Sequence, residues 1–341
     1  ISCAVCHLEG GTDARVWDFT DRGEGLRRTT TLIGKAGTGQ GPLHWSANFD
    51  EVQDFEHDIR GPFKGEGLMP SADFLQGTRN TTLGDKKAGI SADLDALAAY
   101  VTSLSRVNAS PFRNPDGSMT EAALRGKVLF ESEDLGCAKC HAAPNFTDSR
   151  LPGPLEKPVP GPTSVHGKSR SYITAQGFLL HDVGTLKPTS GKRLKDSLPG
   201  LDTPTLKGIW ETGPYLHDGS AATVRDVLTK ANPEDRHGRT SHLSPAQVSD
   251  LEAYLLQLDE TPPDFHVAVR AGKTGRPSAR RSFVLWPGNG AWAGAAGGIP
   301  KDRDFRVLDF NGRRIGDIGE DRSMPRGTAP RILQSETGSR R

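Results

Sequence analysis

Apolar residues recur with helical spacing in three segments of the chain, over 94–104, 120–130 and 251–258. Apolar positions three or four residues apart form one face of an α-helix. Ser91 and Ser244 stand where the first and third segments need a helix N-cap, and Pro245 takes a position that suits the first turn. The pattern therefore predicts three helices.

These helices belong to two copies of one sequence pattern. Each copy has a Thr-rich segment (TTTLIG at 29–34, TPTLKG at 203–208), then a Gly-Pro pair, then a closing helix. The second copy carries a long insertion between His141 and Thr203, rich in Pro, Gly and Ser, and we expect it to be loop. The helix at 120–130 has no counterpart in the first copy, so we expect a segment before Ile1 to supply one.

Two copies of Cys-x-x-Cys-His, at residues 3–7 and 137–141, account for every cysteine in the chain. This motif attaches a c-type haem. A lone Cys-x-x-Cys would also fit a redox dithiol or half a zinc site, but the adjoining histidine and the duplication argue against both. We predict two covalently bound haem c groups, and their attachment residues and first axial ligands are Cys3, Cys6, His7, Cys137, Cys140 and His141.

Repeat and motifs together predict a mainly α protein of two tandem cytochrome c-like helical domains with long loops. Domain 1 spans 1–108 and lacks its N-terminal helix, residues 109–118 form a linker, and domain 2 spans 119–262. Residues 263–341 form a C-terminal extension rich in Gly and Arg, in which 283–286 and 305–310 have the composition of short strands. The role of the extension is not readable from its sequence.

Composition fits this picture and excludes some functions. The chain has 40 Gly and 24 Pro among 341 residues and 34% apolar residues, which suits small domains whose core is completed by a cofactor. The formal charge of +1 gives no reason to expect nucleic acid as a partner. No stretch has the length of a membrane span. Because haem c is attached outside the bacterial cytoplasm, we expect a periplasmic or extracellular protein whose leader has been removed.

The ligand on the far side of each iron decides between electron transfer and chemistry. For the second haem, His237 and His242 lie on a Gly- and Ser-containing loop before the closing helix, and we favour His237. For the first haem the corresponding segment offers Met69 and His57, and a thioether ligand such as Met69 raises a haem potential. His237, His242 and Met69 can each also be explained as loop or packing residues.

Candidate catalytic residues lie in the first copy. Glu51 and Glu56 belong to an acidic run that is either a solvated helix face or a source of a carboxylate for proton transfer. Trp45 is either a core residue or, if it lies between the haems, an electron relay. His44 and His217 each follow a Gly-Pro pair, and we expect them to donate to haem propionates or backbone carbonyls rather than to ligate iron.

The segments LRGKVLF at 124–130 and GCAKCHAAPNFTD at 136–148 resemble the bacterial di-haem cytochrome c peroxidase/MauG family, as do TPTLKG at 203–208 and PYLHDG at 214–219. The likeness covers 110–262 well and 1–106 more loosely. It implies one peroxidatic haem, one electron-relaying haem, a tryptophan between them and calcium as a further cofactor. The methionine or tyrosine that the family has soon after His-Asp-Gly is absent from 228–231. A His-Gly ahead of the closing helix is instead similar to rubber oxygenase-like relatives.

Three functional hypotheses follow. The chain is a peroxidase-like oxidoreductase that reduces peroxide at one haem, a pure electron carrier, or an electron-transfer module of a larger exported protein. Its expected partners are a small redox protein or another electron donor or acceptor, and an upstream domain or partner subunit that packs on domain 1.

Overall fold

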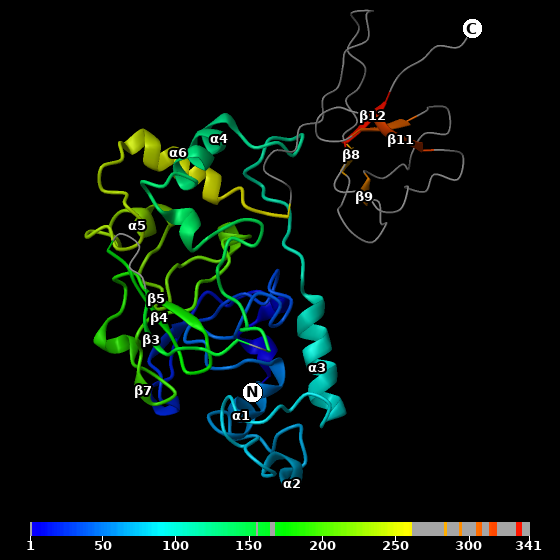
Figure 1. Cartoon of the computed structure of the whole chain (residues 1–341), viewed down its shortest axis with the longest axis vertical. Coiled ribbons are helices and arrows are strands. Elements are labelled where there is room, and N and C mark those ends of the chain that lie inside the picture. The colour runs from blue at the N-terminus through cyan, green and yellow to red at the C-terminus, as the bar shows by residue number, and fades with distance from the viewer. Residues whose placement is uncertain are drawn as a thin grey trace, which may run out of the picture. The chain divides into compact units, whose positions relative to one another are not determined.

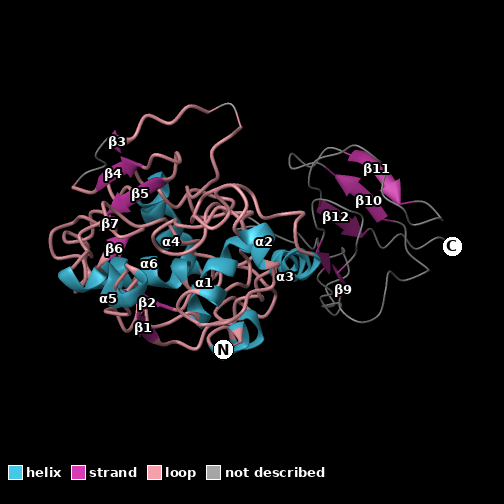
Figure 2. Cartoon of the chain, turned by 90° about the horizontal axis from the view of Figure 1, so that it is seen from below, coloured by secondary structure: helices cyan, strands magenta, loops and turns pink. Residues whose placement is uncertain are grey.

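The computed structural model describes residues 2–154, 156–163 and 168–260, together with strands between residues 283 and 335. The chain divides into two compact units, Ile1–Pro263 and Asp264–Arg341. The first unit contains both haem motifs and is built mainly of short helices and long loops (Figures 1 and 2). It is taken first.

The first copy begins with a small hairpin that the sequence did not predict. Strands β1 (Val16–Asp18) and β2 (Leu26–Arg28) pair antiparallel. Two short helices follow, α1 (Glu56–Arg60) and α2 (Ser71–Phe74). The longest helix of this copy is α3 (Ala92–Ser103), and the Ser91 hydroxyl accepts a hydrogen bond from the backbone of Leu94 at its start. The predicted helix and its cap are therefore confirmed.

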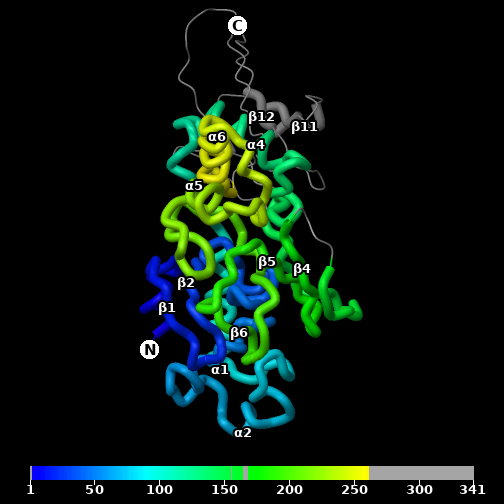
Figure 3. Tube along the Cα trace, turned by 90° about the vertical axis from the view of Figure 1, so that its left-hand side faces the viewer, coloured from blue at the N-terminus to red at the C-terminus, as the bar shows by residue number. Residues whose placement is uncertain are grey.

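The second copy is organised around the packing of α4 (Glu121–Phe130) on α6 (Pro245–Leu255), which lie side by side in Figures 1 and 3. Both predicted helices are confirmed, as is the Ser244 cap, which forms a capping box with Gln247. The contact is close because Gly126 has no side chain: a Cβ there would lie 1.9 Å from the Asp250 carbonyl oxygen.

The core of the second copy lies between these helices and α5 (Val224–Leu228). The Phe130 ring stacks at 5.2 Å from the ring of Tyr254 and at 6.2 Å from that of Phe146, which comes from the segment after the haem motif. This core therefore fastens the attachment segment 137–141 to the helix pair, and it leaves a cavity beside it.

The long insertion of the second copy is not simply loop, so that expectation was wrong in part. It contains a three-stranded antiparallel sheet of β3 (Gly161–Pro162), β4 (Arg170–Ile173) and β5 (Leu179–Asp182). A second hairpin pairs β6 (Lys192–Arg193) with β7 (Asp196–Ser197). These strands are only two to four residues long and do not alternate between buried and exposed positions, so the sequence carries no strand pattern there.

In the second unit, strands occur in both segments where the composition suggested them. β8 (Phe283–Val284) pairs with β9 (Ala293–Gly294). β10 (Phe305–Leu308) lies between β11 (Arg314–Ile318) and β12 (Ile332–Ser335) in an antiparallel sheet. The expected ends of the two strand segments, 285–286 and 309–310, lie outside the described residues.

The two copies in the first unit share backbone details as well as sequence. After each Gly-Pro pair the chain forms the same seven-residue loop, closed by a hydrogen bond from Leu43 N to Phe49 O (2.8 Å) in one copy and from Tyr215 N to Ala221 O (2.7 Å) in the other. These two loops meet at the boundary between the copies, where Trp45 of one loop contacts His217 of the other.

Candidate haem sites

Each Cys-x-x-Cys-His segment is one tight helical turn. The backbone N–H of His7 donates to the Cys3 carbonyl at 2.9 Å, and that of His141 donates to the Cys137 carbonyl at 3.0 Å. The turn brings both cysteines of a motif to one side, as double thioether attachment requires. No disulfide joins any two of the four cysteines, and none of the four is fully buried.

Both attachment histidines are oriented by their Nδ1 atoms. His141 Nδ1 donates to the Phe146 carbonyl at 3.0 Å, and His7 Nδ1 donates to the Gly11 carbonyl at 3.3 Å. Such a bond fixes the tautomer and leaves Nε2 as the free ligand atom. Burial lowers the pKa of both imidazoles, so each is neutral near pH 7 and able to bind a metal.

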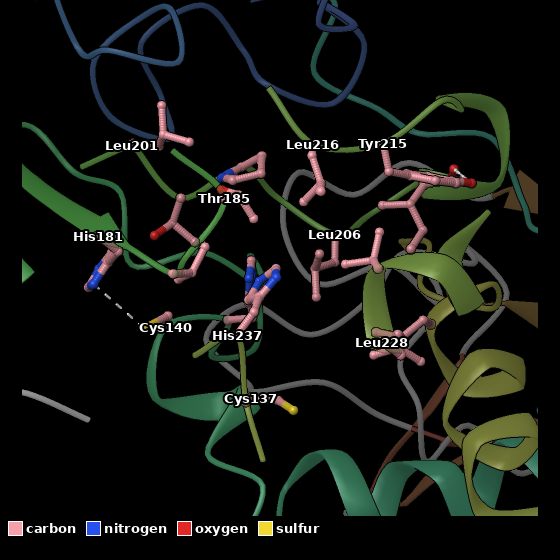
Figure 4. A pocket seen from close by; sticks show the side chains of 18 of the residues that line it. Cys137, Cys140, His181, Thr185, Leu201, Leu206, Tyr215, Leu216, Leu228 and His237 are labelled. Carbon is pink, nitrogen blue, oxygen red and sulfur yellow. Dashed lines mark hydrogen bonds between the residues drawn. The ribbon is translucent and has the colours of Figure 1, made fainter. Parts of the chain in front are cut away.

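A cavity of about 320 Å³ lies beside the second motif. Figure 4 shows its wall, with Cys137 and Cys140 at its edge and His237 among apolar side chains. Those apolar side chains include Leu201, Leu206, Tyr215, Leu216 and Leu228. An apolar cavity that opens onto two thiols and an imidazole has the donor set and the wall that haem c requires.

The predicted ligand His237 lies opposite His141 across this cavity, with ring centroids 6.3 Å apart. Metal–imidazole nitrogen bonds are about 2 Å long and the ring centre lies about 1 Å behind the nitrogen, so two imidazoles on opposite sides of one metal ion have centres about 6 Å apart. The observed gap therefore matches a metal ion held between the two rings. Burial lowers the pKa of His237 to about 4, which keeps the imidazole neutral.

The loop that carries His237 is organised by the buried Asn232. The Asn232 carbonyl oxygen accepts from the backbone N–H of His237 at 2.8 Å, and its amide donates to the Gly238 carbonyl and to Thr240 Oγ1 at 2.8 and 2.9 Å. His242, the other predicted ligand, is not among the residues that line the cavity. Its Nε2 lies 3.0 Å from an oxygen of Asp134 on the protein surface.

No comparable imidazole pair is found at the first motif. Within residues 2–154, 156–163 and 168–260, His7 is in ring contact with no other histidine. Met69, the predicted ligand on this side, is a buried residue, 3% exposed. Its backbone N–H donates to the Glu56 carboxylate at 3.1 Å. The two haem sites therefore differ in their surroundings.

The acidic run of the first copy is buried rather than solvated. The Glu51 carboxylate accepts from the backbone N–H groups of Lys87 (2.6 Å) and Ala88 (3.3 Å), and burial raises its pKa. Beside it, Asp54 and Lys87 form a fully buried ion pair of 2.7 Å. The Glu56 carboxylate pairs with the Arg60 guanidinium at 2.7 Å and holds the segment before α2.

Trp45 lines the cavity of the second haem although it belongs to the first copy. Its indole nitrogen donates to the Arg28 carbonyl at 2.9 Å, and its ring lies edge-on to the His217 ring at 6.5 Å. His217 is completely buried, and its Nε2 lies 2.6 Å from the Ser190 hydroxyl. Trp45 therefore stands at the boundary between the two copies.

The structure corrects the pairing of His44 with His217. His44 and Leu216 occupy the same left-handed position of their loops, with φ of 67° and 69°, so His217 corresponds to Trp45. Neither histidine donates to a backbone carbonyl as expected. His44 Nδ1 is hydrogen bonded to the Asn48 side chain at 2.7 Å, and His217 to Ser190. The two histidines have different partners because His217 lies one position later in its loop than His44 does.

Sequence reasoning missed His181, which lies in β5 of the insertion and lines the same cavity. Its Nε2 is 2.9 Å from Asp148 and its Nδ1 is 2.9 Å from the Ser171 hydroxyl and 3.9 Å from Cys140 Sγ. Burial is the largest single effect and lowers the pKa of His181, but the hydrogen bonds and charges of Asp148 and Cys140 together outweigh it and raise that pKa to about 10. A histidine in a strand has no sequence signal of its own, and it was read as part of a loop.

The turns, the apolar cavity and the opposed imidazoles define a c-type cytochrome. A family model described as "RoxA-like, cytochrome c-like" matches residues 200–238. The chain is 32% identical to the hydrazine synthase subunit gamma of Kuenenia stuttgartiensis over 280 residues, which are 75% of this chain and 72% of the relative. The chain belongs to the di-haem cytochrome c peroxidase/MauG family.

Two further relatives bear the family names. The methylamine utilization protein MauG of Methylophilus methylotrophus is 22% identical over 292 residues, 76% of each chain. The cytochrome-c peroxidase IdrP1 of Denitromonas iodatirespirans is 29% identical over 191 residues, half of each chain. The chain is accordingly a di-haem c-type cytochrome with covalently bound haem c, of the electron-transferring, peroxidase type.

Proposed function

We propose that this protein is an exported di-haem peroxidase that accepts electrons at the His141 haem and delivers them through Trp45 to peroxide at the His7 haem. The observation that supports this division is the asymmetry of the two sites. His141 faces His237 at 6.3 Å, whereas no described histidine is in ring contact with His7. A haem with two protein ligands transfers electrons, and one with an open face performs chemistry.

Haem c supplies a reversible one-electron centre and, where a coordination position is free, a place at which peroxide is reduced. The protein's own residues do the rest. His141 and His237 would hold the second haem, and the Asn232 hydrogen bonds keep His237 in place. Trp45 belongs to the first copy, where its indole nitrogen donates to the Arg28 carbonyl, and it also lines the cavity of the second site.

Proton transfer is assigned to Glu51 or Glu56. Glu51 supports this role because burial raises the pKa of its carboxyl, so it holds a proton more readily than an exposed glutamate. Glu56 is tied to Arg60 and to two backbone N–H groups. We therefore favour Glu51.

Met69 is retained as a ligand that peroxide would displace from the first haem, and His242 as the substitute if His237 does not bind.

Rapid mixing of the half-reduced protein with hydrogen peroxide tests the proposal. We expect a spectral change at the His7 haem within the mixing experiment and steady turnover with an electron donor. Glu51→Gln should slow peroxide reduction by roughly 10²–10⁴-fold, the usual worth of a positioned proton donor. Asp73→Asn, in α2 of the same copy, is the control. No spectral change in any oxidation state would reject peroxidase activity.

The alternative is a non-catalytic electron carrier, alone or as a module of a larger exported protein. It is supported by the relative that is named as a subunit of hydrazine synthase. This hypothesis expects two low-spin haems, reversible reduction by a small redox protein and no reaction with peroxide. In it, an upstream domain or partner subunit would pack against the first copy.

Export to the periplasm or the cell exterior belongs to the same proposal, because haem c is attached outside the bacterial cytoplasm. None of the described helices combines the length and apolar character needed to cross a bilayer.

Calcium is proposed from the family likeness. Among the described residues, the one cluster of three metal-binding side chain types is Cys140, Asp148 and His181, and a single carboxylate does not suit calcium. Treatment with a chelator, followed by activity and thermal unfolding, tests for it.

A further inference from the structure

Two cations of the first copy line the haem cavity of the second. Arg28, the last residue of β2, is 6% exposed, and it has no carboxylate ion pair among the described residues. One of its terminal nitrogens donates to the Thr212 carbonyl, and its Nε has no partner there. The ammonium of Lys35 forms neither an ion pair nor a hydrogen bond within the described part of the chain.

Buried cations without an ion-pair contact are costly, because more distant carboxylates (Asp202 for Lys35 and Asp13 for Arg28) repay the desolvation only in part. Burial lowers the pKa of Lys35, and it lowers that of Arg28 to about 10. An anionic ligand in the cavity would reverse this effect for both groups. Haem c carries two propionate carboxylates, so the charge of the two cations matches that of the cofactor.

The position of the cations agrees with the direction in which haem c must enter. Thioether bonds hold the vinyl edge of the cofactor beside Cys137 and Cys140, and the propionates belong to the edge away from it. In Figure 4 the blue ribbon of the first copy passes on the side of Leu201 and Leu216, away from Cys137. Arg28 and Lys35 come from that copy.

Asp202 lies on the same wall of the cavity. Its backbone N–H donates to the Trp45 carbonyl at 2.8 Å, and one carboxylate oxygen accepts from Ser149 at 2.8 Å. The other oxygen is buried and has no partner among the described residues. The charged groups that act on it are Lys35 of the first copy and Asp148 and His181 of the insertion. Burial raises the pKa of Asp202 to about 7.

We propose that Arg28 and Lys35 of the first copy bind the propionates of the haem attached to the second copy, and that Asp202 takes up a proton when this haem is reduced. One electron comes from the redox donor and one proton from solvent, and no other bond changes. The added negative charge at the haem favours protonation of the neighbouring carboxyl. The proposal rests on haem attachment at 137–141 and not on peroxide reduction.

Redox titration of the purified holoprotein, with dithionite and mediators, tests the cation part. Loss of a positive charge disfavours the reduced state, so Arg28→Gln and Lys35→Met should each shift the potential of the His141 haem to more negative values. Arg28→Lys keeps the charge and should stay close to wild type. Lys64→Met, which removes an exposed cation outside the cavity, is the matched control.

Resonance Raman spectra provide a readout that does not depend on activity. The propionate bending band of the second haem should move in Arg28→Gln and Lys35→Met and stay in Lys64→Met. If Arg28→Gln fails to mature, Lys35→Met at the half-buried Lys35 still tests whether the cations bind the propionates. Potentials and bands that match the Lys64→Met control in both variants would overturn propionate binding by Arg28 and Lys35. A high-spin signal from the second haem of the wild type would instead count against His237 ligation, so the two failures are distinct.

The proton part is tested by repeating the titration at several pH values. The wild-type potential should fall as pH rises through about 7, because Asp202 then gives up its proton. Asp202→Asn should remove this dependence, while Asp196→Asn, at an exposed site in β7, should keep it. An unchanged pH dependence in Asp202→Asn would refute proton uptake at Asp202.

Discussion

Trp45 and His217 occupy the same position in the two copies of the repeat, and their rings meet edge-on with centroids 6.5 Å apart. The backbones around them exchange hydrogen bonds. Asp202 N donates to the Trp45 carbonyl at 2.8 Å, and Arg28 N donates to the His217 carbonyl at 2.6 Å. A pair of equivalent residues that contact each other marks an approximate two-fold relation between the copies at this point.

Replacing Trp45 should slow electron transfer between the two haems. Trp45→Phe keeps an aromatic ring but removes the easily oxidised indole and its hydrogen bond to the Arg28 carbonyl. We expect a slower haem-to-haem transfer rate in flash or stopped-flow measurements, with both haem spectra unchanged. Trp17→Phe, in strand β1, removes an indole that lies outside the cavity and should leave the rate as it is. Equal rates in the two variants would exclude Trp45 as the relay.

His237→Ala should change the coordination of the second haem. The imidazole lies opposite His141 at 6.3 Å, so its removal should convert a low-spin iron to a high-spin or water-bound one. Optical and EPR spectra report this directly. His242→Ala removes a surface histidine paired with Asp134 and should leave the spectra unaltered. The reverse pattern would move the ligand to His242.

His217 should make the protein less stable as the pH falls. Burial lowers its pKa to about 4, below the value near 6.5 in the unfolded chain, so only the unfolded state binds a proton between these values. This difference in proton binding should lower the free energy of unfolding of the protein by about 3 kcal/mol between pH 8 and pH 4. Urea unfolding at several pH values should show a flatter pH dependence in His217→Gln. The difference between the two proteins at pH 8 measures the loss of packing and of the Ser190 contact alone.

Gly126→Ala should destabilise the second copy even though alanine favours helices. The added Cβ would lie 1.9 Å from the Asp250 carbonyl oxygen, so α4 and α6 would have to separate. We expect a loss of roughly 1–3 kcal/mol, the usual cost of overpacking, in thermal or urea unfolding. Val128→Ala, at a 71% exposed site on the same helix, should change stability by less than about 0.5 kcal/mol. A more stable Gly126→Ala would contradict the close helix contact.

Features set by local chemistry could be predicted from the sequence. The three longer helices begin at Ser91, Thr120 and Ser244, since a side-chain oxygen at these positions satisfies an otherwise unpaired backbone N–H. The two attachment turns follow from the spacing of their cysteines. Covalent haem, the family and the di-haem class were all accessible in this way, because the motif itself specifies the bonding partners.

What the tertiary structure decided is which distant residues share a cavity. Loop position favoured His237 over His242, but only the folded chain brings His237 opposite His141 and pairs His242 with Asp134. Likewise, Arg28 lies far from residue 137 along the chain, yet it lines the same cavity. Local sequence patterns indicate which face of each segment is buried. Which residues of the two copies meet depends instead on how their loops pack. The packing makes His217, rather than the residue after it, the counterpart of Trp45.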